Sequence, residues 1–169
     1  MLRFWVYTGK EDATNNMELV LPEELHHFTK PEKMVVFLLL PYLDKGHTIY
    51  MDNWYSSVQL YQYLLQHSTT ACGTLRKNKT PVVIRNKDVC RGEIVKVAAE
   101  NILCLKFVDS SLIHVITTEH NASTQAVLVR GRRRRFPGEQ KQKPVAVCQY
   151  NKYMGGVDKM DQVSFEFLL

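Results

Sequence analysis

The stretch that most constrains this chain is residues 48–57, Thr-Ile-Tyr-Met-Asp-Asn-Trp-Tyr-Ser-Ser. An apolar run of β-forming residues ends at Asp52, and a helical pattern begins shortly afterwards. A carboxylate at the C-terminal tip of a strand, facing the next helix, is a common position for a metal or polar ligand in α/β enzymes. Asp and Asn also form turns and cap helices, so a purely structural role for Asp52 and Asn53 is the alternative.

The hydrophobic periodicity along the rest of the chain predicts a mixed α/β fold. A helix is expected over 32–43, apolar on nearly every face and therefore buried almost all round. A second helix should be capped by Ser56 or Ser57. Gly155-Gly156 should break the chain, with a new helix from Asp158. Short strands are expected at 3–7, 47–52, 70–75, 92–98, 102–108, 112–117, 126–129 and 144–150.

Composition indicates an intracellular globular protein. The chain has 169 residues, 45% of them hydrophobic, which is enough for one domain with a core. No apolar stretch approaches 18 residues, so we expect no membrane partner. The four cysteines show no metal-ligand spacing and should be free thiols, with Cys72 and Cys104 in the core. His114, inside an apolar run, should be a hydrogen-bonded, partly buried imidazole.

The net charge of +5 is concentrated in residues 130–143. Contiguous arginines bind the phosphate backbone by releasing counterions, without base specificity, and such runs also act as nuclear-import signals. We therefore expect non-specific DNA binding and a nuclear location. The alternative is a solvated loop whose like charges repel. The cations of this basic loop are Arg130, Arg132, Arg133, Arg134, Arg135, Lys141 and Lys143.

Five short motifs, spread in order along nearly the whole chain, resemble those of the piggyBac family of cut-and-paste DNA transposases and their domesticated relatives. The resemblance implies an incomplete ribonuclease-H-like transposase core, a mixed sheet with flanking helices. The motifs are Tyr7-Thr8-Gly9-Lys10; Met51-Asp52-Asn53-Trp54-Tyr55-Ser56-Ser57; Gly73-Thr74-Leu75-Arg76; Thr117-Thr118-Glu119-His120-Asn121; and Tyr150-Asn151 with Gly155-Gly156-Val157-Asp158 and Asp161.

Chemistry in that family is strand cleavage and transfer by three aspartates that hold two Mg²⁺ or Mn²⁺ ions. Two such ions stabilise the attacking and leaving oxygens of an in-line phosphoryl displacement. Hard cations prefer charged oxygen ligands, which is why the site needs acids. By resemblance, Asp52 matches the first of the three.

The other two acids are not found where the resemblance places them. The second position corresponds to Asn121, whose amide oxygen carries no full charge, and Glu119 is the nearest residue that could compensate. The third acid is expected beyond an insertion that starts shortly after residue 158, so it is absent from this sequence; Asp158 and Asp161 match a structural signature. We therefore expect the family's Mg²⁺ or Mn²⁺ not to bind productively.

The resemblance divides the chain into three parts: residues 1–45 as the tail of a DNA-binding and dimerisation region, 46–160 as the ribonuclease-H-like core with the basic loop 130–143, and 161–169 as the start of a truncated insertion helix. The leading hypothesis is a piggyBac element-derived protein, catalytically inactive, with residual non-specific DNA binding. One alternative is a fragment of an active transposase. The other is an interaction remnant that pairs with full-length relatives or forms a dimer.

Overall fold

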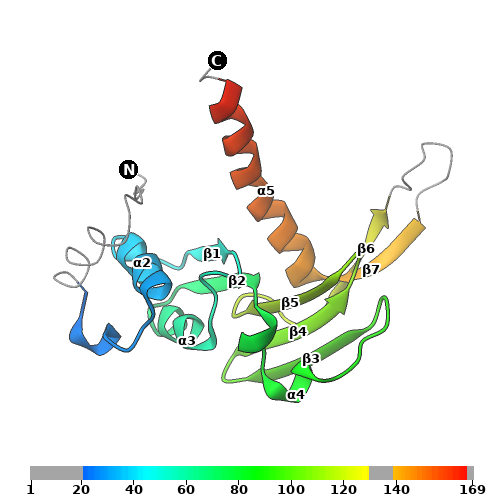
Figure 1. Ribbon diagram of the computed structural model, residues 1–169, viewed down its shortest axis with the longest axis horizontal. Coiled ribbons are helices and arrows are strands. Elements are labelled where there is room, and N and C mark those ends of the chain that lie inside the picture. Colours follow the sequence, from blue (N-terminus) through cyan, green and yellow to red (C-terminus); the bar gives the residue numbers. More distant parts are fainter. Residues whose placement is uncertain (1–20, 130–138, 167–169) are drawn as a thin grey trace.

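The computed structural model describes residues 21–129 and 139–166. Its main feature is a five-stranded mixed sheet with the strand order β1-β2-β5-β4-β3, and a separate two-stranded ribbon, β6-β7, extends from it (Figure 1). The strands are β1 (Thr48–Met51), β2 (Thr70–Thr74), β3 (Ile94–Ala99), β4 (Ile102–Val108), β5 (Leu112–Thr117), β6 (Thr124–Val129) and β7 (Glu139–Pro144). The helices are η1 (Glu23–Leu25), α2 (Lys30–Leu39), α3 (Val58–Gln66), η2 (Lys77–Lys79), α4 (Val82–Arg85) and α5 (Val145–Glu166).

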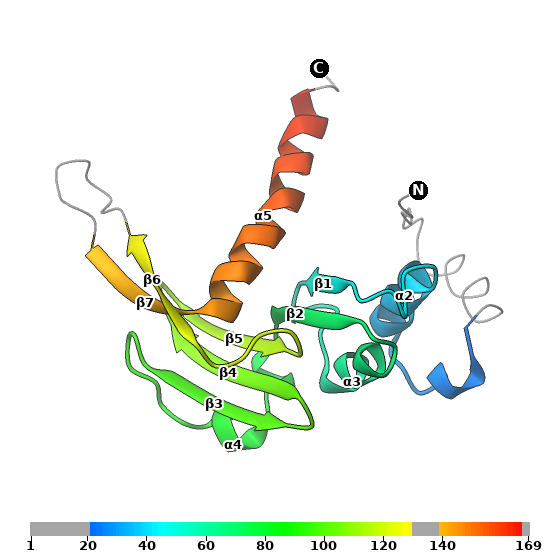
Figure 2. The ribbon, with the colours of Figure 1, turned by 180° about the vertical axis from the view of Figure 1, so that it is seen from behind.

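The sheet is parallel only between β1 and β2, which are joined through α3. Strands β3, β4 and β5 form an antiparallel meander, and β5 then pairs antiparallel with β2 (Figure 2). Glu100 and Asn101, which connect β3 to β4, both have positive φ, at 50° and 65°. That conformation matches the right-handed twist of a tight hairpin, and Asn adopts it more readily than most residues. The meander expected from sequence is confirmed.

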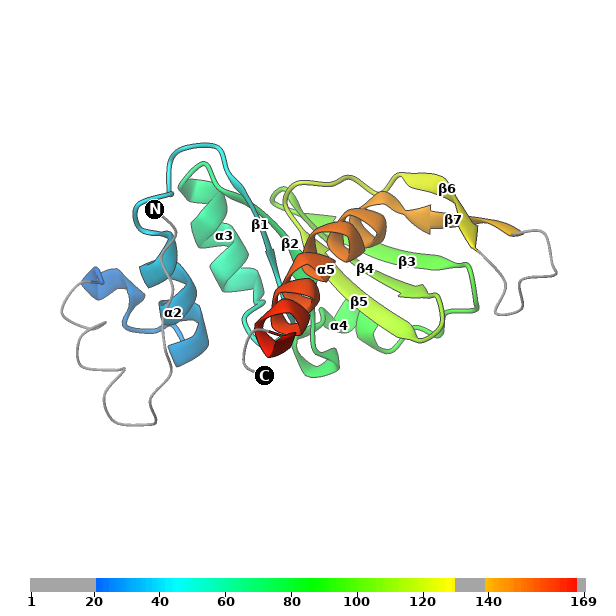
Figure 3. The ribbon, with the colours of Figure 1, turned by 90° about the horizontal axis from the view of Figure 1, so that it is seen from above.

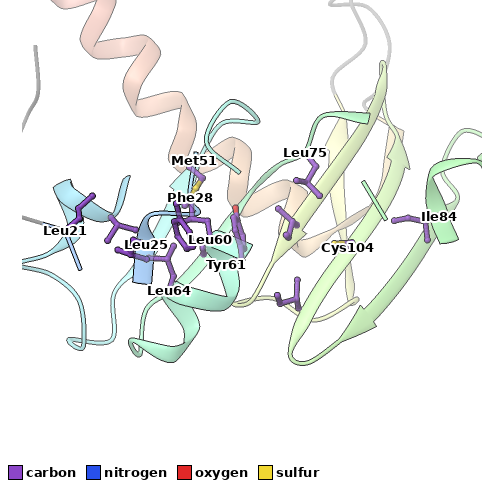
Figure 4. Close-up of a cluster of buried hydrophobic side chains, with 14 residues drawn as sticks. Leu21, Leu25, Phe28, Met51, Leu60, Tyr61, Leu64, Leu75, Ile84 and Cys104 are labelled. Carbon is purple, nitrogen blue, oxygen red and sulfur yellow. The ribbon is translucent and has the colours of Figure 1, made fainter. Parts of the chain in front are cut away.

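The central strands are buried on both faces because helices cover the sheet from two sides. On one face, Ala71, Cys104 and Ile116 pack with α2, α3 and α4. On the other, Cys72, Leu105 and Val115 pack with the first turn of α5. Figure 3 shows α5 passing over β2 and β5, and Figure 4 shows the core side chains gathered between α2, α3 and the sheet. Cys72 and Cys104 are core residues, as predicted.

A buried carboxylate joins the starts of α2 and α3. Glu32 is 4% exposed and accepts hydrogen bonds from the Thr29 backbone N–H at 2.6 Å and the Thr29 hydroxyl at 2.7 Å. The Ser57 hydroxyl donates to the other oxygen of the same carboxylate. Ser57 also accepts from Leu60 N–H at 3.2 Å, which caps α3 as expected. One side chain therefore completes a capping box on α2 and holds α3 beside it.

Gly73 lies where β1, β2 and α3 make their closest approach. A Cβ added at this position would lie 2.4 Å from the Met51 carbonyl oxygen, 2.5 Å from the Tyr61 hydroxyl and 2.8 Å from Ser56 Oγ. Ser56 and Tyr61 are both fully buried. No L side chain fits there without moving the backbone that leads into Asp52.

Three expectations from sequence are wrong. The segment 144–150 is not a strand: α5 begins at Val145, because Val147 and Tyr150 pack on the sheet at helical spacing. Gly155 and Gly156 do not interrupt the secondary structure. Helix α5 continues through them to Glu166, so no new helix begins at Asp158. The helix over 32–43 ends at Leu39 and is only partly buried, with Glu32 and Val36 its buried residues. The strand expected at 3–7 lies outside the described residues.

We expect Gly73→Ala to lower the free energy of unfolding by about 3 kcal/mol, because backbone atoms lie within the space its methyl group needs. Gly155→Ala is the matched control: no atom lies within 4 Å of its added Cβ, so it should stabilise the helix by up to about 1 kcal/mol. Urea denaturation followed by circular dichroism measures both changes. Equal stability of the two variants would contradict the close packing at Gly73.

Candidate functional site: the turn after β1 and its pocket

The backbone of the turn after β1 is fixed by hydrogen bonds to one carbonyl group. The Asp52 carbonyl oxygen accepts from Tyr55 N–H at 3.1 Å, Ser56 N–H at 3.3 Å and the Ser56 hydroxyl at 3.1 Å. Ser56 is buried next to Gly73, so the turn is anchored to the core while the Asp52 side chain remains exposed. The sequence prediction of an acid at the C-terminal tip of a strand is confirmed by this placement.

The Asp52 carboxylate borders a cavity of about 540 Å³. The cavity lies between the C-terminal ends of β1 and β2, the start of β5 and the first turns of α5. Asp52 Oδ1 accepts a hydrogen bond from the Thr74 hydroxyl at 3.3 Å. Thr74 in turn lies 3.4 Å from the Tyr150 hydroxyl on α5. The cavity is lined by Asp52, Asn53, Thr74, Leu75, Lys77, Leu112, Ile113, His114, Val115, Val147, Tyr150 and Asn151.

Cations from the segment after β2 lie beside this turn. Arg76 donates from Nε to the Asn53 amide oxygen at 3.2 Å, and its guanidinium carbon lies 4.4 Å from the centroid of a Trp54 ring. Lys79 donates to the Ser56 carbonyl oxygen at 3.0 Å. Lys77 lines the cavity. Arg76, Lys77 and Lys79 were not predicted from sequence as site residues, although three cations directly after a strand were an available signal.

The structure does not bring Glu119 or Asn121 to Asp52. Strand β5 runs antiparallel to β2, so its C-terminal end lies where β1 begins. Glu119 accepts a weak hydrogen bond from Thr48 Oγ1 at 3.4 Å. Thr48 precedes Asp52 by four residues, which is about 13 Å of extended chain. The Asn121 amide oxygen accepts from Ser123 N–H at 2.9 Å. Glu119 and Asn121 line a second cavity, which Asp52 does not reach.

The donor set around Asp52 does not fit a pair of divalent ions. Among the described side chains, Asp52 is the only carboxylate that lines its cavity, and Lys77 there adds positive charge. No group of three or more His, Cys, Asp or Glu side chains that could hold a metal occurs within residues 21–128 and 140–155, the part whose side chains are described. Two closely spaced cations need several anionic oxygens. The described side chains alone therefore do not form a two-metal centre.

His114 borders the same cavity and is 7% exposed. Its Nδ1 lies 2.7 Å from the Thr80 hydroxyl, which confirms the expected hydrogen-bonded imidazole. The cross-strand neighbour of His114 is Lys106, whose buried ammonium group donates to the carbonyl oxygens of Arg85 and Lys87. Burial lowers the pKa of His114 below its ordinary value, and the positive charges of Lys106 and Lys77 lower it further.

Most of the basic loop expected to bind DNA lies outside the described residues, including Arg130, Arg132, Arg133, Arg134 and Arg135. The two lysines of that group lie on β7. Lys143 forms an ion pair with Asp109, and only 14% of its side chain is exposed. That pairing reduces the charge that Lys143 can present to a polyanion, while Lys141 borders a cavity at the base of the ribbon.

Burial raises the pKa of the Cys72 thiol to about 12, so this core cysteine is not a nucleophile at neutral pH. Among the described residues, no helix is both long enough and apolar enough to cross a bilayer.

Comparison with known proteins identifies the family. Residues 1–167 match the family of DDE-type transposases described as Transposase IS4. The fold is similar to the piggyBac transposase in the cryo-EM structure of its synaptic complex with hairpin DNA, with a TM-score of 0.65 and 25% sequence identity. The match covers 93% of this chain but 30% of that transposase chain. The mixed sheet with flanking helices is thus part of a ribonuclease-H-like fold, as expected from the sequence.

We expect the His114 imidazole to titrate below pH 6.5 in a nuclear magnetic resonance titration. Because its pKa is lower in the folded than in the unfolded chain, the unfolded chain takes up the proton first, and stability falls as the pH drops through 6.5. Lys77→Ala removes one of the positive charges that lower this pKa and should move the midpoint upwards. A wild-type midpoint at or above 6.5 would contradict the buried, cation-flanked environment.

Proposed function

Because the chain belongs to the IS4 family of DDE-type transposases and is of the piggyBac type, we propose that it binds the DNA backbone at the Asp52 turn without carrying out strand transfer by its described residues. The observation that carries the proposal is the cationic segment Arg76–Lys79 beside Asp52. Lys77 lines the Asp52 cavity, whose other walls come from the sheet and α5, and Arg76 donates a hydrogen bond to Asn53, which lines the same cavity. A phosphate there would find a guanidinium and an ammonium group within one turn of chain.

The basic loop, residues 130–143, offers a second set of cations for the proposed DNA binding. Its cations can contribute to affinity through counterion release, independently of sequence. Lys143 is already paired with Asp109, so we assign a larger share of the contact with DNA to the arginines 130 and 132–135 and to the Arg76–Lys79 segment.

Loss of strand transfer is proposed because the family's metal-dependent chemistry needs a set of acids that the described residues do not assemble. In the part of the chain with described side chains, no second carboxylate lines the Asp52 cavity, and position 121 carries an amide at the opposite end of the strands. When bound, divalent ions would supply the charge stabilisation for phosphoryl displacement. Here, Thr74 offers a hydroxyl group to Asp52, and Lys77 adds an ammonium group to the lining of the same cavity; these groups suit phosphate binding better than cation binding.

A second candidate is the segment of an active transposase. This chain covers 30% of the length of the similar piggyBac transposase chain, and it keeps Asp52 exposed on a rigid turn. In that case, acids outside the described residues would complete the site around Asp52. Metal binding that depends on Asp52 separates the two candidates.

We expect the chain to bind a fluorescein-labelled DNA hairpin in an anisotropy assay, with affinity falling steeply between 50 and 200 mM salt. Arg76→Ala and Lys77→Ala should each weaken binding and lower the salt slope by about one unit, because each removes one phosphate contact. Lys96→Ala, which alters an exposed lysine on β3, is the control and should have little effect. Equal losses for all three variants would argue against a specific role for the Asp52 turn.

Calorimetric titration with Mn²⁺ should show no site that depends on Asp52, either in the natural chain or in Asn121→Asp. The reason is geometric: a carboxylate at residue 121 would lie near the start of β1, away from Asp52. Asp52→Ala is the matched control for any weak binding. Tight Mn²⁺ binding that Asp52→Ala abolishes would refute the proposal that the chain binds DNA without strand transfer, and it would favour a segment of an active transposase. Cleavage of the hairpin DNA in the presence of Mn²⁺ would do so directly.

A further inference from the structure

Trp54 is a large aromatic side chain that the Asp52 turn holds in solvent. It is 55% exposed, although Ser56, two residues later, is fully buried and fixes the turn. The backbone at Tyr55 and Ser56 is hydrogen-bonded to the Asp52 carbonyl oxygen, so the position of Trp54 is set by the turn. An exposed indole on a rigid backbone has few internal contacts to lose and a large π-surface to offer a ligand.

One side of the indole is already in contact with a cation. The Arg76 guanidinium lies 4.4 Å from a Trp54 ring centroid and is held there by its hydrogen bond to Asn53. This cation–π contact orients the ring and adds positive charge next to it. Since more than half of the side chain is still exposed, an open part of the indole is left for a second flat group.

Trp54 also lines a cavity of about 470 Å³, which lies within the range of small-ligand sites, about 300–1,000 Å³. Its other walls come mainly from the start of α2: Pro31 and Met34 supply apolar surface and Lys30 an ammonium group. A flat apolar ring attached to an anion matches these walls. A nucleobase with its phosphate has that chemistry.

We propose that Trp54 stacks against an unpaired nucleobase of DNA whose neighbouring phosphate lies at the Asp52 cavity. The inference rests on the proposed function, because it takes DNA bound at the Asp52 turn as its premise. Asn53 lines the Asp52 cavity, and the next residue, Trp54, lines the cavity at the start of α2. The two cavities are therefore bordered by consecutive residues of the turn. The base must be unpaired, since stacking on the indole needs a face that neighbouring base pairs do not cover.

The test compares Trp54→Ala and Trp54→Phe with the natural chain in anisotropy titrations. One DNA is a hairpin with a single-stranded flank, and the other is a fully paired duplex of the same length. Trp54→Ala should weaken binding to the flanked hairpin by about tenfold or more, because one stacked base is lost. Binding to the duplex should change by no more than roughly twofold, because the electrostatic contacts are kept. Trp54→Phe, which retains a ring, should recover most of the loss.

A second measurement reads the stacking directly. With 2-aminopurine at an unpaired position of the flank, emission should be quenched by the natural chain and by Trp54→Phe but not by Trp54→Ala. Val83→Ala, which truncates another exposed apolar side chain, is the control and should quench like the natural chain. Thermal unfolding should be the same for all variants, since both altered side chains are exposed.

The outcomes separate the two proposals. Weakening of duplex and flanked hairpin to the same extent by Trp54→Ala, or no effect on either, would overturn the stacking inference and leave DNA binding at the turn in place. Failure of the natural chain to bind either DNA would overturn the proposed function and the stacking inference with it.

Discussion

The close approach of backbone and side chains at Gly73 is the constraint on which the candidate site depends. At this residue, β2 comes so near to the end of β1 that even a methyl group would meet the Met51 carbonyl oxygen. Tyr61 and Ser56 close the same space from α3 and from the turn. The buried Ser56 also donates to the Asp52 carbonyl oxygen. Core packing therefore fixes the backbone of the residue that carries the exposed carboxylate. Rigid packing of this kind is how a fold holds an exposed functional group in one position.

Two buried charged side chains, Glu32 and Lys106, are each held by hydrogen bonds in separate parts of the core. Glu32 ties α2 to α3 through Thr29 and Ser57, so the cavity wall formed by the start of α2 is fixed relative to the turn that carries Trp54. A buried carboxylate is costly unless its oxygens are hydrogen-bonded, and both oxygens of Glu32 have partners. The ammonium group of Lys106 likewise donates to the carbonyl oxygens of Arg85, the last residue of α4, and of Lys87 just after it.

Strand direction decides which residues can act together. The candidate second position, Asn121, follows β5, and β5 is antiparallel to β2 while β1 is parallel to it. The end of β5 therefore meets the beginning of β1, where Glu119 reaches Thr48 and His120 lies 3.2 Å from the Tyr50 hydroxyl. The residues that line the cavity with Asp52 come from β2, the segment after it, the start of β5, and α5. That neighbourhood is cationic and hydroxyl-bearing, which accounts for the assignment of phosphate binding.

Local sequence by itself determined the strand that leads into Asp52, the Ser57 cap, the three-strand meander and the core cysteines, because alternation, capping and turn preferences act over a few residues. Tertiary structure decided the rest. Val147 and Tyr150 have strand-forming side chains, yet their packing on the sheet makes residues 145–166 a helix that continues through two glycines. Strand order and direction set Glu119 apart from Asp52, brought Arg76 to Asn53 and placed Lys77 in the lining of the Asp52 cavity. Neither follows from local pattern, because the pairing of strands far apart in the chain is fixed only when their faces are buried together.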